Sequence, residues 1–564
     1  MTWRSVFERS SLIFAVLFVI CGFYIFELFQ KQVLEHDQYA EAAATQSTST
    51  TTQPADRGKI IAQDKDGNSY LLAVSEWQYQ LLLSPRQVKN PEKLVAALKT
   101  QLPNLDTAAA LAAIATQKVY VPPVMKGINA DDAQKINDQN YAGVSLIPQL
   151  ARIYPEADKI AAQVLGFVGG DGSGKYGVEA TYNDQLTGNP GSQSAKKDSL
   201  GRLIDVLGSS TPTPGANAIL TLDYNLQYEV ENVLKAGISQ YQADSGSITV
   251  MDPNNGAVLA MAGEPTFDPN NYGALTGDAQ RAYLPPAISD VYEPGSVVKT
   301  LTMSAALNEG VVTPDTANNF NAPVTIDGHT IYNALNKIFG HENMTQVMEN
   351  SDNIAMTWVS GLLGKEKQRE YLDKFGFGKK TGIDLVGEQY STLPELKNWP
   401  DILRANAAFG QGVATTTVNL AADYCAVADG GYSVTPHVVS KLDYGDHTET
   451  KDYPKGAQII SSQTATEVRA MLQAVVDNGE GKRARVAGMT VGGKTGTAQV
   501  PNPQGGYYTD RSIGTFIGMF PVDNPKYVMA VRVNNPKTVQ FAESSAAPIF
   551  GTIADWMATY FQLR

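Results

Sequence analysis

The segment 292–310 reads YEPGSVVKTLTMSAALNEG and carries the most informative local pattern in the chain. Its Pro-Gly pair predicts a turn, and residues 297–307 have helical composition that ends near Gly310. Ser296 is therefore predicted to open a helix. Because residues three apart share one face of a helix, Lys299 is expected one turn above the Ser296 hydroxyl. A desolvated lysine with a lowered pKa can act as the base that activates a serine nucleophile.

A second serine, Ser194, also stands three residues before a lysine, in GSQSAKKDS. Its flanks are polar, Pro190 and Gly191 are close by, and no helical periodicity surrounds it. A Ser-x-x-Lys spacing specifies so few residues that it arises by chance. Ser194 is interpreted as such a chance occurrence, and Ser296 is the predicted nucleophile.

Downstream, the sequence MENSDNIAMTWV contains the triplet 351–353. Taken alone, this triplet predicts a helix N-cap before an apolar helix. Beside Ser296 it supports a second interpretation, in which Ser351 relays a proton between Lys299 and a leaving amine. Asn353 then offers its amide to hold the backbone of a substrate.

Two Lys-Thr-Gly triplets occur, and their surroundings differ. Residues 380–382 lie in FGFGKKTGIDLVGE, which predicts a loop before a short strand. Residues 494–496 lie in VAGMTVGGKTGTAQV, which is typical of a strand whose glycines allow a ligand to approach the backbone. An edge strand there can bind a substrate by β-addition, with Lys494 and Thr495 holding a carboxylate.

An oxyanion hole is expected from the backbone NH groups of Ser296 and Thr497, and the helix amino terminus adds positive potential there. The predicted site divides into two groups of residues. The catalytic group is Ser296, Lys299 and Ser351, and the substrate-binding group is Asn353, Lys494, Thr495, Gly496 and Thr497.

The grouping S-x-x-K, S-D-N and K-T-G, in this order, resembles class B penicillin-binding proteins, the elongation- or septum-type peptidoglycan D,D-transpeptidases. GQGVATTTVNLAADYCAVADGGY and SIGTFIGMFP are similar to further landmarks of that class. Upstream, ADRGKI, RIYPEADKIAAQVLGFVG and YGVEATYNDQLTGNPG resemble its amino-terminal, non-catalytic domain, so the likeness covers most of the chain from Arg57 onward. The chain departs from the family at Asp352, where a serine is common, and in lacking a glutamine after the threonines of GVATTTVNL.

The resemblance implies an α+β fold. A penicillin-binding/β-lactamase-like transpeptidase domain, an antiparallel sheet flanked by helices plus a helical lobe, is expected over residues 216–564. A mixed α/β, non-catalytic pedestal or dimerisation domain is expected over residues 57–215, with a helical region at 91–117. Local patterns agree, because residues 246–261 predict a hairpin and residues 545–563 an apolar closing helix.

The implied activity is that of a serine D,D-transpeptidase that crosslinks peptidoglycan stem peptides through a Ser296 acyl-enzyme, with a D,D-carboxypeptidase side reaction when water attacks. β-Lactams are the implied inhibitors. The implied partners are the lipid-linked peptidoglycan precursor, nascent glycan strands, a SEDS-type glycosyltransferase and other membrane proteins of cell-wall synthesis. No cofactor is implied.

Two alternatives remain. A β-lactamase shares the three motifs, and Glu395 with Asn398 matches the E-x-x-N spacing of a deacylating loop, although a charged surface loop explains these residues equally well. The other alternative is a catalytically silent β-lactam sensor or divisome scaffold. Intact motif residues argue against a decayed enzyme, but a sensor would keep them as well.

The amino-terminal part predicts a membrane anchor. Residues 11–29 are long and apolar enough to form a transmembrane helix, and no small-residue cleavage site follows as a signal peptide requires. Arg4 and Arg9 lie before this span, so residues 1–10 are expected to be a cytoplasmic tail and the catalytic domain extracytoplasmic. Residues 30–56 include TQSTSTTTQ and predict a polar, mobile tether.

Composition sets broader limits. With 564 residues, 43% hydrophobic and 18% charged, the chain is expected to fold into several globular units. A net charge of −13 argues against a nucleic-acid partner. The five histidines lack metal-ligand spacing and the two cysteines give no disulfide framework, so no metal site is predicted.

Overall fold

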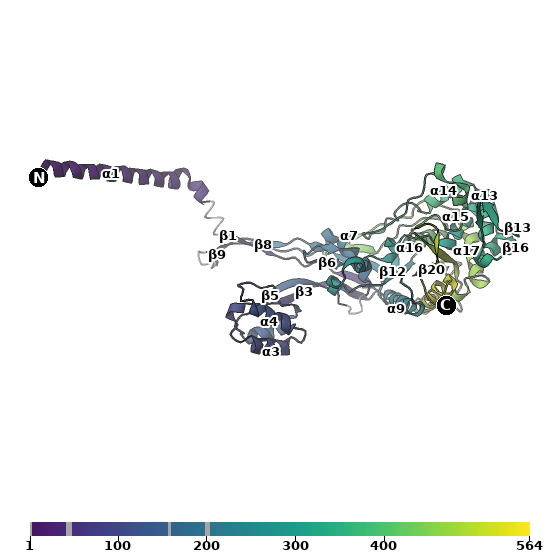
Figure 1. Ribbon diagram of the computed structural model, residues 1–564, viewed down its shortest axis with the longest axis horizontal. Coiled ribbons are helices and arrows are strands. Elements are labelled where there is room, and N and C mark those ends of the chain that lie inside the picture. The colour runs from purple at the N-terminus through teal and green to yellow at the C-terminus, as the bar shows by residue number, and fades with distance from the viewer. Residues whose placement is uncertain (1–2, 41–47, 156–159, 198–202, 503) are drawn as a thin grey trace. The chain divides into compact units, whose positions relative to one another are not determined.

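The computed structural model describes residues 3–40, 48–155, 160–197, 203–502 and 504–564, and the chain divides into two compact units. The anchor unit comprises Met1–Asp56 and Gly188–Pro214, and the main unit comprises Arg57–Thr187 and Gly215–Arg564 (Figure 1). The pedestal expected over residues 57–215 is thus distributed over both units.

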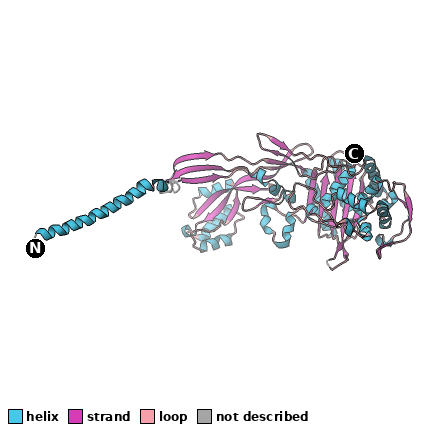
Figure 2. Cartoon of the chain, turned by 90° about the horizontal axis from the view of Figure 1, so that it is seen from above, coloured by secondary structure: helices cyan, strands magenta, loops and turns pink. Residues whose placement is uncertain are grey.

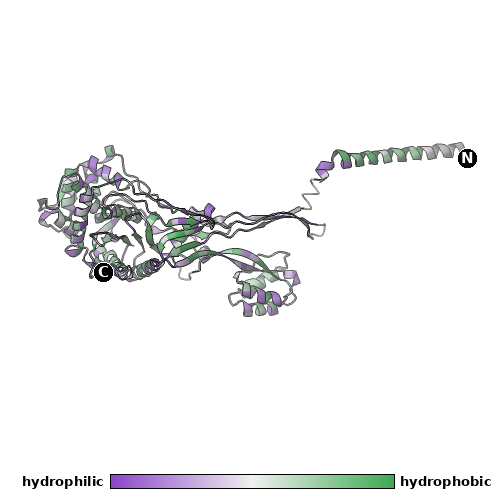
Figure 3. Cartoon of the chain, turned by 180° about the vertical axis from the view of Figure 1, so that it is seen from behind, coloured by the Kyte–Doolittle hydropathy of each residue, from purple (hydrophilic) through white to green (hydrophobic). Residues whose placement is uncertain are grey.

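The anchor unit begins with helix α1 (Trp3–Phe29), which continues into a π-helical turn at Gln30–Leu34. The span Ser11–Leu34, which includes the π-helical turn, is long and apolar enough to cross a membrane, and an 18-residue window in it has a mean hydropathy of 2.6. Figure 3 shows these apolar residues in green.

The anchor unit also holds a three-stranded antiparallel sheet in the order β1-β8-β9. The strands are β1 (Thr48–Gln53), β8 (Gly191–Lys197) and β9 (Leu203–Ser210). The expectation of a mobile tether is wrong over Thr48–Gln53, because this threonine run forms a strand that pairs antiparallel with residues 191–196 of β8. β-Branched threonine favours strands. Composition alone, however, does not indicate that the partner strand is β8, which is far away in the sequence. Residues 41–47 of the predicted tether lie outside the described residues.

The main unit contains a seven-stranded sheet with strands from both of its parts. These parts are the pedestal segment, Arg57–Thr187, and the segment expected to be catalytic, Gly215–Arg564, which is called the catalytic segment below. Its members are β2 (Ile60–Gln63), β3 (Ser69–Leu83), β4 (Met125–Ile128), β5 (Val144–Ile153), β10 (Asn217–Asp223), β17 (Val439–Asp443) and β18 (Thr448–Thr450). Strand β10 pairs in parallel with β2, Ala218 opposite Ile60, and antiparallel with β17. The boundary predicted at residue 215 therefore precedes a strand that belongs to the same sheet as the pedestal.

The predicted helical region at 91–117 is confirmed as two helices, α3 (Pro91–Gln101) and α4 (Thr107–Ala115), followed by α5 (Ala130–Asp138). Asn90 and Asp106 cap α3 and α4 by accepting backbone NH groups. The three helices share a small hydrophobic core with β3 and β4.

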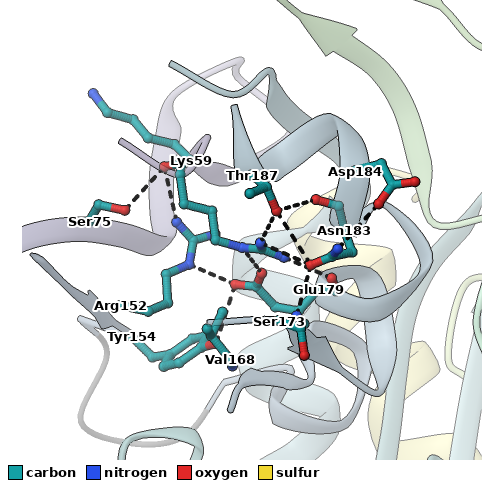
Figure 4. A network of polar contacts seen from close by, with 12 residues as sticks. Lys59, Ser75, Arg152, Tyr154, Val168, Ser173, Glu179, Asn183, Asp184 and Thr187 are labelled. Carbon is teal, nitrogen blue, oxygen red and sulfur yellow. Dashed lines mark hydrogen bonds and ion pairs between the residues drawn. The ribbon is translucent and has the colours of Figure 1, made fainter. Parts of the chain in front are cut away.

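A buried ionic network organises the base of the pedestal segment (Figure 4). The Glu179 carboxylate, whose side chain is 0% exposed, accepts 2.6 Å hydrogen bonds from Arg57 Nε and Arg152 Nε. Tyr154 Oη also donates to Glu179, at 3.3 Å, and Arg57 Nη1 donates to Thr187 Oγ1 at 2.8 Å. Short elements surround this network: α6 (Ala162–Leu165), β6 (Phe167–Val168), β7 (Gly174–Lys175), α7 (Gly177–Thr181) and α8 (Asn183–Thr187).

The catalytic segment is built on a five-stranded antiparallel sheet in the order β12-β11-β21-β20-β19 (Figure 2). Its strands are β11 (Ser245–Met251), β12 (Val258–Glu264), β19 (Gly492–Pro501), β20 (Tyr507–Phe520) and β21 (Tyr527–Asn534). The predicted 246–261 hairpin is confirmed by β11 and β12. The predicted closing helix is confirmed as α18 (Ala546–Tyr560).

Helices cover both faces of this sheet, because alternate strand residues point to opposite sides. Phe516 of β20 packs in one core with α9 (Tyr224–Tyr241) and α18. Ile517, the next residue, packs in the other core with α11 (Lys299–Asn308) and α16 (Thr417–Ala428).

The helical lobe adds α10 (Pro286–Ser289), α12 (Met344–Asn350), α13 (Asn353–Leu363), α14 (Lys365–Lys374), α15 (Asp401–Ala407) and α17 (Ser462–Asp477). Short strands β13 (Ala317–Phe320), β14 (Val324–Ile326), β15 (His329–Ile331) and β16 (Gly340–Asn343) complete it.

Candidate active site

Ser296 lies in a 3-10 turn, Gly295–Val298, that runs directly into helix α11. The prediction that Ser296 opens a helix is confirmed, with a tighter first turn than expected. Gly295 has φ +63 and its NH donates to Gly410 O at 3.1 Å. A Cβ on Gly410 would meet Gly295 O at 2.1 Å, so this close backbone contact fixes the start of the turn.

Lys299, at the first position of α11, is completely buried. Its Nζ donates to Ser351 O and, at 3.1 Å, to Ser351 Oγ. In the described part of the chain no hydrogen bond joins the side chains of Ser296 and Lys299. Burial, together with the positive charge of Lys494, lowers the pKa of Lys299 to about 7. Lys299 therefore has a substantial neutral fraction near neutral pH and can accept a proton.

Ser351 lies between two helices, at the C-terminal end of α12, in the left-handed conformation with φ 57 and ψ 42. This conformation is uncommon for a non-glycine residue. The predicted N-cap role belongs to its neighbour Asp352, whose side chain accepts the Ala355 NH at 2.7 Å at the start of α13. The turn between the helices thus frees the Ser351 hydroxyl to contact lysines.

Strand β19 is an edge strand of the five-stranded sheet, as predicted for residues 494–496. The fully buried Lys494 donates from Nζ to Ser351 Oγ at 2.9 Å and to Thr495 Oγ1 at 3.3 Å. Burial lowers the pKa of Lys494, while the nearby Glu480 carboxylate opposes that shift. Ser351 Oγ is consequently the meeting point of two buried lysines, one from α11 and one from the sheet edge.

Gly496 allows the sheet edge to approach the Ser296 turn. A Cβ at Gly496 would lie 2.7 Å from Pro294 O and 3.2 Å from Val297 N. One residue further on, Thr497 lies next to the same turn, since a Cβ on Gly295 would stand 3.3 Å from Thr497 O. The backbones of Ser296 and Thr497 are therefore neighbours, as an oxyanion hole shared between them requires.

Asn353 lies at the start of α13 and lines the same cavity as Ser296. Its Nδ2 donates to Tyr332 O at 2.9 Å, and its backbone NH donates to Asn333 Oδ1 at 2.6 Å. The amide NH₂ that was predicted to hold a substrate thus has an internal partner.

These groups converge on a cavity of about 1280 Å³. Its wall includes six polar residues from the motifs and their surroundings: Ser296, Ser351, Asn353, Glu480, Thr495 and Thr497. Glu480 belongs to no motif and was missed by the sequence analysis. The only signal for it was its place in the glycine-flanked sequence NGEGK shortly before the strand.

The other candidates named from the sequence lie elsewhere. Ser194 lies on β8 of the anchor unit, 3.0 Å from Thr50 Oγ1. Thr381, of the second Lys-Thr-Gly triplet, lies in a loop where Glu388 accepts its backbone NH at 2.6 Å, and the short strand predicted after it is not formed among the described residues. Glu395 is 70% exposed and pairs with Lys397, which agrees with a charged surface loop.

The fold and this convergence of motifs agree with comparisons to known proteins. Residues 246–555 match the family described as the penicillin-binding protein transpeptidase domain. Residues 52–220 match the penicillin-binding protein dimerisation domain. The chain belongs to the penicillin-binding protein transpeptidase family, so the resemblance expected from the sequence is confirmed.

Individual relatives span most of the chain. It is 32% identical to stage V sporulation protein D of Bacillus subtilis, over 97% of this chain and 85% of that protein. It is 31% identical to the peptidoglycan D,D-transpeptidase FtsI of Escherichia coli, over 76% of this chain and 70% of that protein. Among solved structures, penicillin-binding protein 3 of Mycobacterium tuberculosis, in complex with aztreonam, has a TM-score of 0.70 and 28% identity, covering 91% of this chain and 98% of that one.

Proposed function

We propose that this chain is a membrane-anchored peptidoglycan D,D-transpeptidase whose nucleophile is Ser296. The observation that carries the proposal is that Ser296 and Ser351 line one cavity and that two fully buried lysines both donate to Ser351 Oγ. A lysine with a pKa of about 7, one helical turn from a serine, supplies a general base without histidine.

In the first half-reaction, neutral Lys299 takes the Ser296 hydroxyl proton while Oγ bonds to the carbonyl carbon of the penultimate D-Ala. The backbone NH groups of Ser296 and Thr497 stabilise the resulting oxyanion. The peptide bond then breaks, and the departing D-Ala amine receives a proton relayed from Lys299 through Ser351. The hydrogen bond from Lys299 Nζ to Ser351 Oγ, 3.1 Å long, supports this route.

In the second half-reaction, an amine of a neighbouring stem peptide attacks the Ser296 ester. Its proton passes to Lys299, the ester bond breaks, and Ser296 Oγ recovers its proton, which leaves a crosslinked product and free enzyme. Lys494 and Thr495 hold the terminal carboxylate of the donor stem in the first step, since a cation beside a hydroxyl suits a carboxylate. Gly496 admits the substrate backbone to the sheet edge, and Asn353 orients the substrate.

The proposal is tested by intact-mass analysis after exposure to benzylpenicillin. We expect one stable adduct on the wild-type protein, none on Ser296→Ala, and an unchanged adduct on Ser194→Ala, the matched control. Equal labelling of wild type and Ser296→Ala would remove Ser296 from the mechanism. Rapid turnover of the drug would favour the β-lactamase alternative, for which the exposed position of Glu395 gives no support.

A silent sensor would label with penicillin as well, so labelling alone does not separate it from an enzyme. The measurement that separates the two is crosslinking of nascent glycan. A SEDS-type glycosyltransferase, the proposed partner, makes this glycan from the lipid-linked precursor. Wild type is expected to form crosslinked stem-peptide dimers and Ser296→Ala none. Labelling without dimers in both proteins would favour the sensor or scaffold.

The proposed topology places the amino terminus in the cytoplasm and the catalytic segment outside the cytoplasmic membrane, with α1 as a single-pass anchor. The apolar span Ser11–Leu34 supports an anchor. External protease digestion of spheroplasts is expected to remove a C-terminal tag and spare an N-terminal one. Loss of the N-terminal tag with the C-terminal tag intact would indicate the opposite topology.

A further inference from the structure

Glu480 lies where a ligand carboxylate would be expected. It follows helix α17 and lines the cavity beside Ser296, with its side chain 37% exposed. Thr495 Oγ1 donates to Glu480 Oε2 at 3.2 Å, and Lys494 Nζ is 3.8 Å from the same oxygen. Glu480 therefore uses the same two partners that the proposed function assigns to the terminal carboxylate of the substrate.

Hydrogen bonds hold the backbone at Glu480 in place. If a ligand displaces the Glu480 carboxylate, the side chain therefore moves and the backbone does not. The NH groups of both neighbouring glycines, Gly479 and Gly481, donate to Val475 O at 3.0 Å. The Glu480 NH itself donates to Glu349 O at 3.3 Å, and a Cβ on Gly479 would meet that same oxygen at 2.4 Å. A partly exposed glutamate side chain on such a backbone can rotate into solvent without movement of the loop.

The charges around Glu480 give it an electrostatic role of its own. Lys494 and Lys299 are both fully buried, and burial lowers the pKa of each. The Glu480 carboxylate acts against both shifts and so favours the ammonium form of Lys494 when no ligand is bound. The other carboxyl groups near Lys299 are Asp352 and Glu342, and neither hydrogen-bonds Thr495.

We propose that Glu480 is a specificity-determining residue, an internal carboxylate that occupies the carboxylate subsite and that an incoming ligand carboxylate must displace. This inference rests on the proposed role of Lys494 and Thr495. Two carboxylates cannot share these partners without like-charge repulsion, so each carboxylate ligand exchanges one ion pair for another. The consequence is that ligands with a carboxylate acylate Ser296 more slowly than they would if Glu480 carried no charge.

The test compares benzylpenicillin with its carboxamide on the full-length protein in detergent. The quantity measured is the ratio of the acylation rate constants for the two ligands. We expect Glu480→Gln to raise this ratio about fivefold, the scale of a partly exposed ion pair. Glu349→Gln, which removes a neighbouring charge outside the cavity, is the matched control and is expected to leave the ratio unchanged. Glu480→Ala is expected to act as Glu480→Gln does.

An unchanged ratio in Glu480→Gln would overturn the inference. If the ratio stayed constant while both rate constants rose, Glu480 would act only through the pKa of Lys299, which affects both ligands alike. Failure of the proposed nucleophile is distinguishable, since it would abolish labelling at Ser296 in the wild type. Failure of the proposed transpeptidase activity would appear as labelling without crosslinked stem-peptide dimers. The equilibrium affinities of the two ligands, measured in a Ser296→Ala background, then decide the role of Glu480 without any acylation.

Discussion

Lys494 Nζ donates a 2.9 Å hydrogen bond to Ser351 Oγ, which joins the sheet edge to the helical lobe at a single hydroxyl. The same oxygen accepts from Lys299 Nζ at 3.1 Å. Because a hydroxyl carries one proton and two acceptor lone pairs, Ser351 can accept from one lysine while it donates to the other in its neutral form. This arrangement suits a proton relay.

Ser351→Ala is expected to slow acylation of Ser296 by benzylpenicillin by about 10²- to 10⁴-fold, the range for a lost general acid–base group. Its melting temperature should change little, because Ser351 is only half-buried. Ser289→Ala, which removes another half-buried hydroxyl with a backbone partner, is the control. A wild-type acylation rate in Ser351→Ala would exclude the relay.

The pH dependence of acylation should follow Lys299. The reactive form is the neutral amine, so the rate constant rises with pH through about 7 and falls about tenfold per unit below it. The positive charge of Lys494 lowers the pKa of Lys299, so Lys494→Ala is expected to move the midpoint to higher pH. The measurement is the acylation rate constant between pH 5 and pH 9, with the two midpoints compared. A midpoint that stays in place or moves to lower pH would contradict the coupling of the two lysines.

Much of this site could be predicted from the sequence because its chemistry lies in short motifs with a defined local geometry. Ser296 and Lys299 are one helical turn apart, and Lys494 lies on a glycine-rich strand, so spacing alone indicates where they point. Glu480 and Glu179 could not be predicted in this way. Their partners, Thr495 and Arg57, are 15 and 122 residues away in the sequence, and a lone glutamate gives no periodic signal.

The same limit explains two features of the fold that the sequence patterns did not indicate. The 48–53 strand pairs with residues 191–196, a register that a threonine run does not specify. The boundary expected at 215 divides β2 from β10, whose parallel pairing connects two segments that sequence patterns treat as separate domains.

Lys299 is expected to reduce the stability of the folded protein while it enables the chemistry. Its pKa falls from 10.5 in the unfolded chain to about 7 in the fold, so between these values the unfolded state binds more protons. Stability therefore rises as pH increases from about 7 toward 10.5, and the burial penalty is fully present below pH 7. Lys299→Met is expected to abolish acylation and to increase the free energy of unfolding by a few kcal/mol at pH 6, with a smaller gain at pH 9.5.

Urea denaturation at the two pH values checks the Lys299→Met prediction, and Lys380→Met is the control. Lys380 is exposed and belongs to the loop triplet, so its replacement should leave acylation and the free energy of unfolding close to those of wild type. A stability gain that is equal at both pH values would indicate a packing effect instead of relief from a buried charge.

The buried network around Glu179 should be far more important for stability than a surface pair. Glu179→Ala leaves Arg57 and Arg152 without their carboxylate and is expected to cost about 3–5 kcal/mol, as for a broken buried ion pair. Glu395→Ala breaks the exposed pair with Lys397 and is expected to change stability by less than about 1 kcal/mol. Urea denaturation of both variants gives the comparison, and similar small losses would show that the network contributes little net stability.

The proposed carboxylate role of Lys494 leads to a test with amidated ligands. Lys494 is buried, and Thr495 Oγ1 lies 3.3 Å from its Nζ, so a terminal carboxylate can meet a cation and a hydroxyl together. Amidation of a D-Ala-D-Ala mimic is expected to remove most of its reactivity with wild type. The same amidation should cost Lys494→Ala little, since the partner of the carboxylate is already absent. Lys380→Ala, from the other Lys-Thr-Gly triplet, is expected to behave as wild type. If amidation reduced the reactivity of Lys494→Ala as much as that of wild type, another group would have to bind the carboxylate, and the displacement assigned to Glu480 would lose its basis.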